Sequence, residues 1–157
     1  MTRVKAGPVE AEFAQQVDEL RKEVEAVTPE RQMARPVSDE EARLLELARV
    51  SPRSAILEAW RGVEIAATKA VDSHSRQAVS DASTGYRTRT SPVALGRELG
   101  LLGIFNGKQM SVFHELRALR NQAAHVEDFE IEFESVNSYI QLTRSLVADL
   151  KAAVPSA

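Results

Sequence analysis

The chain has 157 residues, of which 43% are hydrophobic and 27% charged, and its formal net charge is −3. This size and composition fit a globular protein with one core, and the acidic balance excludes a protein that coats nucleic acid through a broad basic surface. Cysteine is absent, which excludes disulfides, thiolate metal sites and cysteine nucleophiles and fits a cytoplasmic location. Three scattered histidines without an H-E-x-x-H pattern make a poor case for a zinc site, and we expect no metal and no other cofactor. No apolar run reaches the roughly 20 residues that a membrane-spanning helix needs.

The N-terminal part predicts one amphipathic helix and a linker. Over about residues 12–26 the apolar residues recur at spacings of four and three: Phe13, Val17, Leu20, Val24 and Val27. This helix either lies on the core or pairs with a second copy, although a stripe of about two heptads is short for a coiled coil. Pro29 and Pro36 indicate a linker. We therefore divide the chain into residues 1–37, the N-terminal helix and linker, and residues 38–154, a helical bundle domain.

Two serines mark the starts of the next helices. Ser38 with Glu41 three residues later is a capping-box pattern, and it predicts a helix that ends near Val50. Ser51-Pro52 begins a second helix, whose inner face we assign to apolar residues at helical spacing: Ile56, Trp60, Val63, Ala67 and Val71. Residues 73–90 are rich in Ser, Thr, Asp and Gly, and we expect a mobile loop there.

A short helix follows this loop. Ser91-Pro92 repeats the start signal, and the leucines at 95, 99 and 102 give an apolar stripe. Gly103 is expected to end the helix, with Ile104 as the hydrophobic contact of the C-cap.

Two longer helices complete the predicted fold. Asn106 with Gln109 is another cap pattern, and helical periodicity continues over about 108–124 and again over about 134–153. The residues between them, 128–133, alternate like a strand but are too few to form a sheet alone. The sequence therefore predicts an all-α fold, a bundle of five to six helices.

The end of the 108–124 helix carries the residues best suited to chemistry. Arg120, Asn121 and His125 stand within six residues, and such a set can hold a phosphate and move a proton. At about 100° per residue Arg120 falls among the apolar residues of the inner face, which are Val112, Phe113, Leu116, Leu119 and Ala123. A buried, unpaired arginine costs several kcal/mol. Glu64, one turn after Trp60, is the partner that we predict.

Two interpretations of this motif stay open from the residues alone. A Glu64–Arg120 pair can simply fix the register of two helices, and His125 can cap the last carbonyls or bind Asp128. Alternatively, the helix C-terminus together with Glu127 and Asp128 favours the imidazolium form of His125, which is then a general acid.

The spacing R-N-x-x-x-H over residues 120–125 resembles the signature of the HEPN superfamily of helical domains. The resemblance covers about residues 40–152 and extends to a bacterial HEPN-like branch of unassigned function. The features that carry it are Trp60, Glu64, Gly103-Ile104, L-R-A-L-R-N-Q-A-A-H (116–125), Ile131 and V-N-S-Y-I-Q-L (136–142).

This resemblance implies one of two functions. Many HEPN proteins are metal-independent endoribonucleases of toxin, defence or RNA-processing systems, in which two motifs face each other across a dimer cleft. In such an enzyme Arg120 holds the scissile phosphate, Asn121 orients it, and His125 transfers a proton, which leaves a 2′,3′-cyclic phosphate. Other members are non-catalytic dimerisation or nucleotide-sensing modules. We expect a homodimer with RNA or another protein as partner, and we favour the non-catalytic interaction module.

Charge around the motif bears on the RNA alternative. An acidic run that would repel RNA follows the motif: Glu127, Asp128, Glu130, Glu132 and Glu134. Arg87 and Arg89 in the polar loop, together with Arg117 on the motif helix, are the basic residues that we predict as phosphate or RNA contacts. Side chains of this kind are also common on solvated surfaces.

Overall fold

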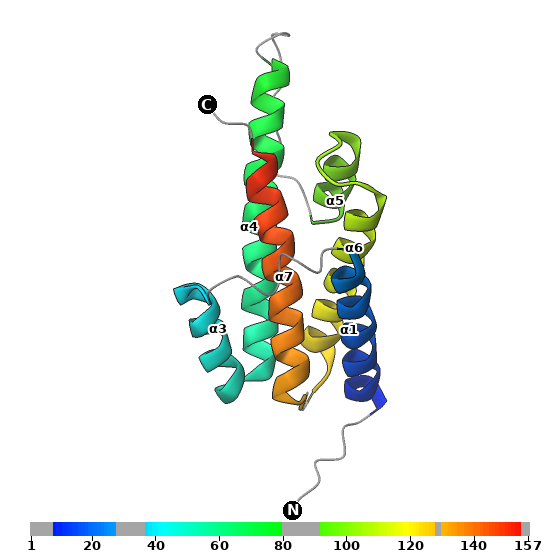
Figure 1. The fold of residues 1–157 in the computed structure, drawn as a ribbon, viewed down its shortest axis with the longest axis vertical. Helices are drawn as coiled ribbons and strands as arrows, with labels where there is room; N and C mark the ends of the chain where they lie inside the picture. The colour runs from blue at the N-terminus through cyan, green and yellow to red at the C-terminus, as the bar shows by residue number, and fades with distance from the viewer. Residues whose placement is uncertain (1–7, 28–36, 80–91, 128–129, 155–157) are drawn as a thin grey trace, which may run out of the picture.

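The structure is a computed structural model of the chain that describes residues 8–27, 37–79, 92–127 and 130–154. The described residues form six α-helices and no strand, which confirms the predicted all-α bundle. The helices are α1 (Pro8–Val27), α3 (Asp39–Val50), α4 (Pro52–Val79), α5 (Pro92–Leu101), α6 (Gly107–His125) and α7 (Phe133–Ala153). The long helices α4 and α7 lie side by side, with α3 on one side of them and α1, α5 and α6 on the other (Figure 1). None of these helices is long and apolar enough to cross a membrane.

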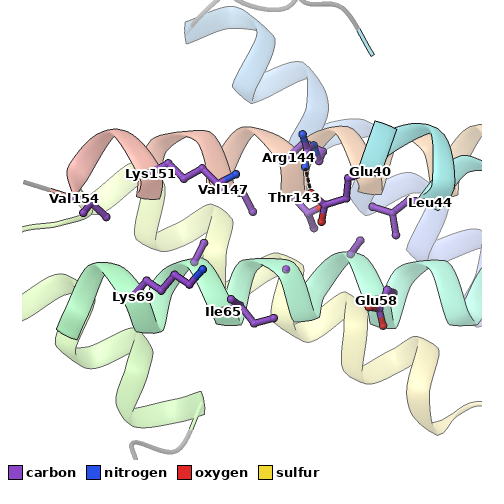
Figure 2. A pocket seen from close by; sticks show the side chains of 13 residues that line it. Glu40, Leu44, Glu58, Ile65, Lys69, Thr143, Arg144, Val147, Lys151 and Val154 are labelled. Carbon is purple, nitrogen blue, oxygen red and sulfur yellow. Dashed lines mark hydrogen bonds and ion pairs between the residues drawn. The ribbon is translucent and has the colours of Figure 1, made fainter. Parts of the chain in front are cut away.

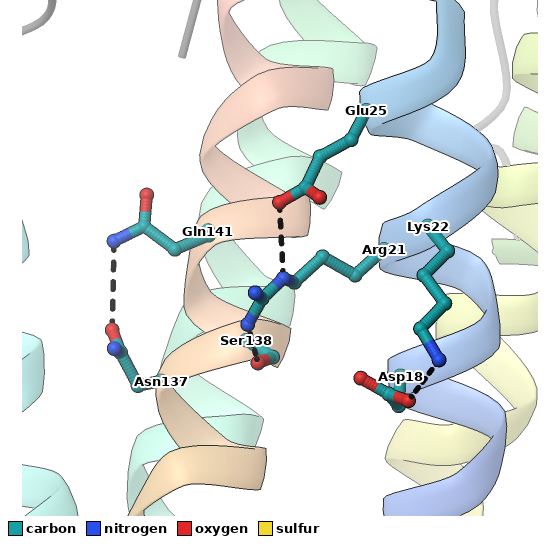
Figure 3. Close-up of polar contacts among 7 residues, drawn as sticks. All are labelled: Asp18, Arg21, Lys22, Glu25, Asn137, Ser138 and Gln141. Atoms are coloured by element: carbon teal, nitrogen blue, oxygen red, sulfur yellow. Dashed lines mark hydrogen bonds and ion pairs between the residues drawn. The ribbon is translucent and has the colours of Figure 1, made fainter. Parts of the chain in front are cut away.

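The N-terminal helix α1 lies on the core of the bundle. Phe13, Val17 and Leu20 are at most 1% exposed and belong to the same buried cluster as the residues of the later helices. Arg21 adds a polar contact, since its Nη1 donates to Ser138 Oγ of α7 at 3.2 Å (Figure 3). Of the two alternatives for this helix, packing on the core is therefore confirmed. The predicted linker lies outside the described residues over 28–36.

The predicted capping box at Ser38 is only half formed. Ser38 Oγ accepts from the backbone N–H of Glu41 at 3.2 Å, as expected. The Glu41 carboxylate does not return to Ser38, because it is buried and accepts a hydrogen bond from Gln141 Nε2 of α7. Arg144 of α7 then reaches the same cap, with Nη2 donating to Ser38 Oγ at 2.8 Å and Nη1 to Glu40 at 3.0 Å. The start of α3 is thereby tied to α7.

The helix α4 is longer than predicted. It begins at Pro52 as the sequence predicts, but residues 73–79, which the composition assigns to a loop, continue the helix to Val79. The His74 ring supports this extension, with Nδ1 at 2.9 Å from the carbonyl oxygen of Ala70. Lengthening an existing helix costs far less than nucleating one, so a polar composition alone does not end it. The rest of the predicted loop falls outside the described residues.

The helix α5 ends in the predicted glycine C-cap. Gly103 has φ +67°, its N–H donates to the Gly100 carbonyl at 3.1 Å, and the Ile104 N–H donates to the Leu99 carbonyl at 3.0 Å. These two bonds form a Schellman motif, which satisfies carbonyls that have no partner within the helix.

Replacing Gly103 with alanine is expected to lower the free energy of unfolding by about 1–2 kcal/mol, because a Cβ is disfavoured at positive φ. A Cβ built there has no neighbour within 4 Å, so the loss is conformational and not a clash. Urea denaturation measures it. Gly107→Ala, which also has no neighbour within 4 Å but a helical backbone, is the control that should show no loss. Equal destabilisation of both variants would contradict the expectation.

The motif helix α6 has the predicted start and the predicted inner face. Asn106 and Gln109 form a capping box, with both hydrogen bonds at 2.9 Å. The buried side chains of α6 are Val112, Phe113, Leu116, Leu119 and Ala123. Phe113 contacts Trp60 of α4, with ring centroids 5.1 Å apart, and this contact fixes the motif helix against the central pair.

Candidate functional site

Arg120 lies at the edge of the core of the bundle. Its side chain is partly buried, and its Nε is buried without a hydrogen-bond partner. Nη1 donates to Asn121 Oδ1 at 3.1 Å in an exposed contact. The guanidinium therefore has one enclosed side and one side near solvent, at the edge of the apolar face on which the helical wheel places Arg120.

Tyr139 of α7 is the buried neighbour of this arginine. The tyrosine is 0% exposed, and its hydroxyl donates to the Leu116 carbonyl of α6 at 2.9 Å. Burial raises the pKa of Tyr139 well above its usual value, while the positive charge of Arg120 lowers it and the negative charge of Glu64 raises it. Sequence reasoning missed Tyr139, although a tyrosine within the apolar stripe of the last helix was a visible signal.

The Glu64 carboxylate is hydrogen-bonded to Trp60 and makes no ion pair with Arg120. Glu64 Oε1 accepts from Trp60 Nε1 at 2.8 Å, and across the described ranges no ion pair joins Glu64 to Arg120. Both charges nevertheless act on the Tyr139 hydroxyl. The indole N–H is a nearly buried donor that needs an acceptor, and Glu64 lies one turn away on the same helix. The structure therefore does not show the direct Glu64–Arg120 pair that the sequence predicts.

His125 and Arg120 diverge around the axis of α6. Five residues at about 100° each separate the two side chains by about 140°. His125 is the last residue of α6 and is exposed, and within the described part of the chain its ring has no hydrogen bond or ion pair. Asp128, one of its predicted partners, lies outside the described residues. On a regular helix the two side chains therefore leave α6 in different directions.

The C-terminal end of α6 is capped by an arginine from another helix. Arg53, at the start of α4, donates from Nη2 to the carbonyl of Val126, the C-cap residue of α6. A cation at this position also interacts favourably with the helix dipole. The sequence leaves this capping role open for His125, whereas at the Val126 carbonyl the structure has Arg53. Arg53 gave no sequence signal, because 73 positions separate the two partners.

Of the other predicted site residues, the structure describes Arg117 and Asn121. Arg117 is partly buried, and its Nη1 is enclosed without a hydrogen-bond partner. Arg87 and Arg89 lie outside the described residues. Asn121 is exposed and contributes only its bond to Arg120. Contact of Arg87, Arg89 and Arg117 with RNA therefore stays a prediction.

An acidic cluster lies where α1 packs near α6. Partial burial raises the pKa of Glu115 on α6, and the negative charges of Glu23 and Glu19 on α1 raise it further, whereas a hydrogen bond with Ser111 lowers it. Such a cluster repels the phosphates of a nucleic acid.

Neither of two surface hollows in the described structure contains the motif. One, of about 240 Å³, lies between α3, α4 and α7 (Figure 2). The other, of about 280 Å³, lies between α1 and the start of α7. Arg120, Asn121 and His125 line neither of them. Within the described residues no group of three or more His, Asp or Glu side chains is placed to hold a metal ion.

No protein-family model, no curated protein and no solved structure matches the chain. The HEPN resemblance therefore rests on the sequence features given above.

Proposed function

We propose that the chain is a non-catalytic helical interaction module, in which Arg120 helps to hold α6 against α4 and α7. The observation that carries this proposal is the arrangement of the motif. Arg120 is partly enclosed beside Tyr139, while His125 is exposed about 140° away around the helix. A residue pair that cleaves RNA must reach one phosphate from two sides. A structural contact that holds helices together, which we call a structural clasp, needs only the arginine.

The HEPN resemblance supports a homodimer in a bacterial system of the defence or toxin type, and the absence of cysteine fits a cytoplasmic location. Members without catalysis serve as dimerisation modules, so a second copy and a further protein are the partners that we propose.

A metal-independent endoribonuclease is the second candidate. One observation favours it: the bond between Arg120 and Asn121 is at an exposed position, so the free edge of the guanidinium faces the same solvent as Asn121. Two copies whose motifs face each other would place the Arg120 of one chain near the His125 of the other, and only such a composite site could act on a phosphate.

Incubating the purified protein with labelled RNA in EDTA distinguishes the two functions. For the interaction module we expect no cleavage of any of several unrelated RNAs. Cleavage that disappears in both Arg120→Ala and His125→Ala, with folding intact, would overturn the module and establish the enzyme.

Stability of the same variants gives a second measure. Arg120→Ala is expected to lower the free energy of unfolding by about 1–2 kcal/mol, because aliphatic packing and charge are lost together. His125→Ala is exposed and should change it by less than about 0.5 kcal/mol. Arg43→Ala, at an exposed position of α3, is the matched arginine control. An Arg120 variant as stable as the Arg43 control would argue against a clasp.

A further inference from the structure

The helix α3 covers only part of the face of the α4–α7 pair on which it packs. The helix α3 has 12 residues, whereas α4 has 28 and α7 has 21. Beyond the N-terminal turns of α3, the two long helices continue side by side without it (Figure 1). The hollow of about 240 Å³ lies along this stretch and ends near Val154 (Figure 2). We call it the α4–α7 groove.

The floor of the α4–α7 groove suits a packed helix. Its lining includes small and aliphatic side chains, among them Ala59, Ala66 and Val147. Gly62 has no side chain, and a Cβ built there meets nothing within 4 Å. Ile65 at the rim is 48% exposed. Small residues flanked by aliphatic ones form the kind of groove into which the ridges of a neighbouring helix fit.

The charges of the groove are compensated at one end only. Near α3 both acids have basic partners in the chain: Glu40 pairs with Arg144 at 3.0 Å, and Glu58 with Arg61 at 3.7 Å. At the far end, Lys151 of α7 and Lys69 of α4 extend along the same stretch from opposite walls (Figure 2). Among the described residues neither lysine has a carboxylate partner. This end therefore carries two positive charges that a ligand can neutralise.

We propose that the α4–α7 groove binds an acidic amphipathic helix of a partner protein, which lies between α4 and α7 in line with α3. The chain's own α3 already packs on both helices in this way. The apolar face of the partner helix covers Val147 and Ile65, and its acidic side chains reach Lys69 and Lys151. From Thr143 to Val154 the groove extends about 16 Å, which corresponds to three helical turns. This inference rests on the proposed function as an interaction module and specifies the chemistry of the partner.

The probe is a fluorescein-labelled synthetic helix of about four turns, with leucine and alanine on one face and glutamate on the other. A second peptide carries lysine in place of every glutamate. Fluorescence anisotropy should show saturable binding of the glutamate peptide that weakens with added salt, and much weaker binding of the lysine peptide. Equal binding of both peptides, or no binding of the glutamate peptide up to about 1 mM, would overturn the proposal.

Gly62→Leu blocks the groove without threatening the fold. A Cβ at this position meets nothing within 4 Å, and leucine replaces a poor helix former with a good one, so thermal stability should be unchanged or higher. Binding should weaken by at least about tenfold, because the floor is filled. Gly100→Leu on α5, an exposed glycine outside the groove, is the control that should bind like the original chain. Unchanged binding by Gly62→Leu would contradict the proposed location.

Charge reversal tests the lysine end separately. The double variant Lys69→Glu, Lys151→Glu should bind the glutamate peptide at least about tenfold more weakly and should gain affinity for the lysine peptide. Lys108→Glu, at an exposed position of α6, should change neither affinity. If the Lys108 variant loses binding as well, the loss of affinity reflects the net charge of the protein, and the proposal of a specific groove is overturned.

Light scattering and the RNA assay separate the remaining outcomes. If the original chain dimerises and Gly62→Leu is monomeric, the occupant is a second copy and the proposal of a different partner is wrong. If RNA is cleaved in EDTA, the proposed function as an interaction module is wrong, whether or not the peptide binds. If RNA stays intact while the peptide does not bind, only the inference about the groove fails.

Discussion

Replacing Trp60 with alanine is expected to lower the free energy of unfolding by about 3–5 kcal/mol, the range for removing a buried large aromatic side chain. Trp60 is 2% exposed, and its ring lies 5.1 Å from that of Phe113 where α4 meets α6. The truncation leaves a cavity at this crossing, and it removes the indole donor from Glu64. A half-buried carboxylate without its donor adds to the cost.

Trp60→Phe separates the two contributions. Phenylalanine keeps most of the ring volume but has no N–H, so the loss should fall to about 1–2 kcal/mol. Guanidinium denaturation at pH 7 measures both variants against the original chain. A loss below about 1 kcal/mol for the alanine variant would mean that α4 and α6 are not held together at this contact.

Local signals in the sequence predicted the ends of several helices well. Gly103 ends α5 with a positive φ, and Asn106 with Gln109 forms the expected capping box. These features depend on residues at most a few positions apart, and the residue types alone determine their preferred backbone conformations. The inner face of α6 followed from helical periodicity for the same reason.

Contacts between distant residues were not predictable in this way. The pattern at Ser38 suggested a reciprocal cap, but Glu41 is drawn to Gln141 on α7. The end of α4 was placed too early, because composition does not show what supports an extended helix in the fold. The carbonyl of Val126 is bound by Arg53, and nothing near either residue indicates the other.

The candidate site shows the same division. Periodicity placed Arg120 within an apolar stripe, and the side chain is indeed partly enclosed. Its charged partner could not be chosen from sequence, because Trp60 on the same helix competes for Glu64 at 2.8 Å. Tyr139 then lies under the influence of both charges. A one-dimensional pattern shows which residues face inward, but not which polar atoms meet there.

The stability of the protein is expected to fall steeply above pH 10 because of Tyr139. In the unfolded chain a tyrosine ionises with a pKa of about 10. In the folded chain burial raises the pKa of Tyr139 well above that value, since Arg120 opposes the rise only in part and Glu64 adds to it. Below pH 10 both states keep the proton and stability is unaffected. Above pH 10 only the unfolded state releases it, which lowers stability by up to about 1.4 kcal/mol per pH unit until the folded pKa is reached.

Tyr139→Phe isolates this effect from the titration of lysines and arginines, which is common to both proteins. At pH 7 the variant should lose about 0.5–1.5 kcal/mol with the hydrogen bond to the Leu116 carbonyl. Between pH 10 and pH 12 its stability should fall less steeply than that of the original chain, so that the two curves cross or converge. Denaturant unfolding followed by circular dichroism at each pH measures the difference. Parallel curves over this range would mean that the Tyr139 hydroxyl ionises freely in the folded state. Arg120 would then border an open surface, and the basis for assigning Arg120 to a structural clasp would be removed.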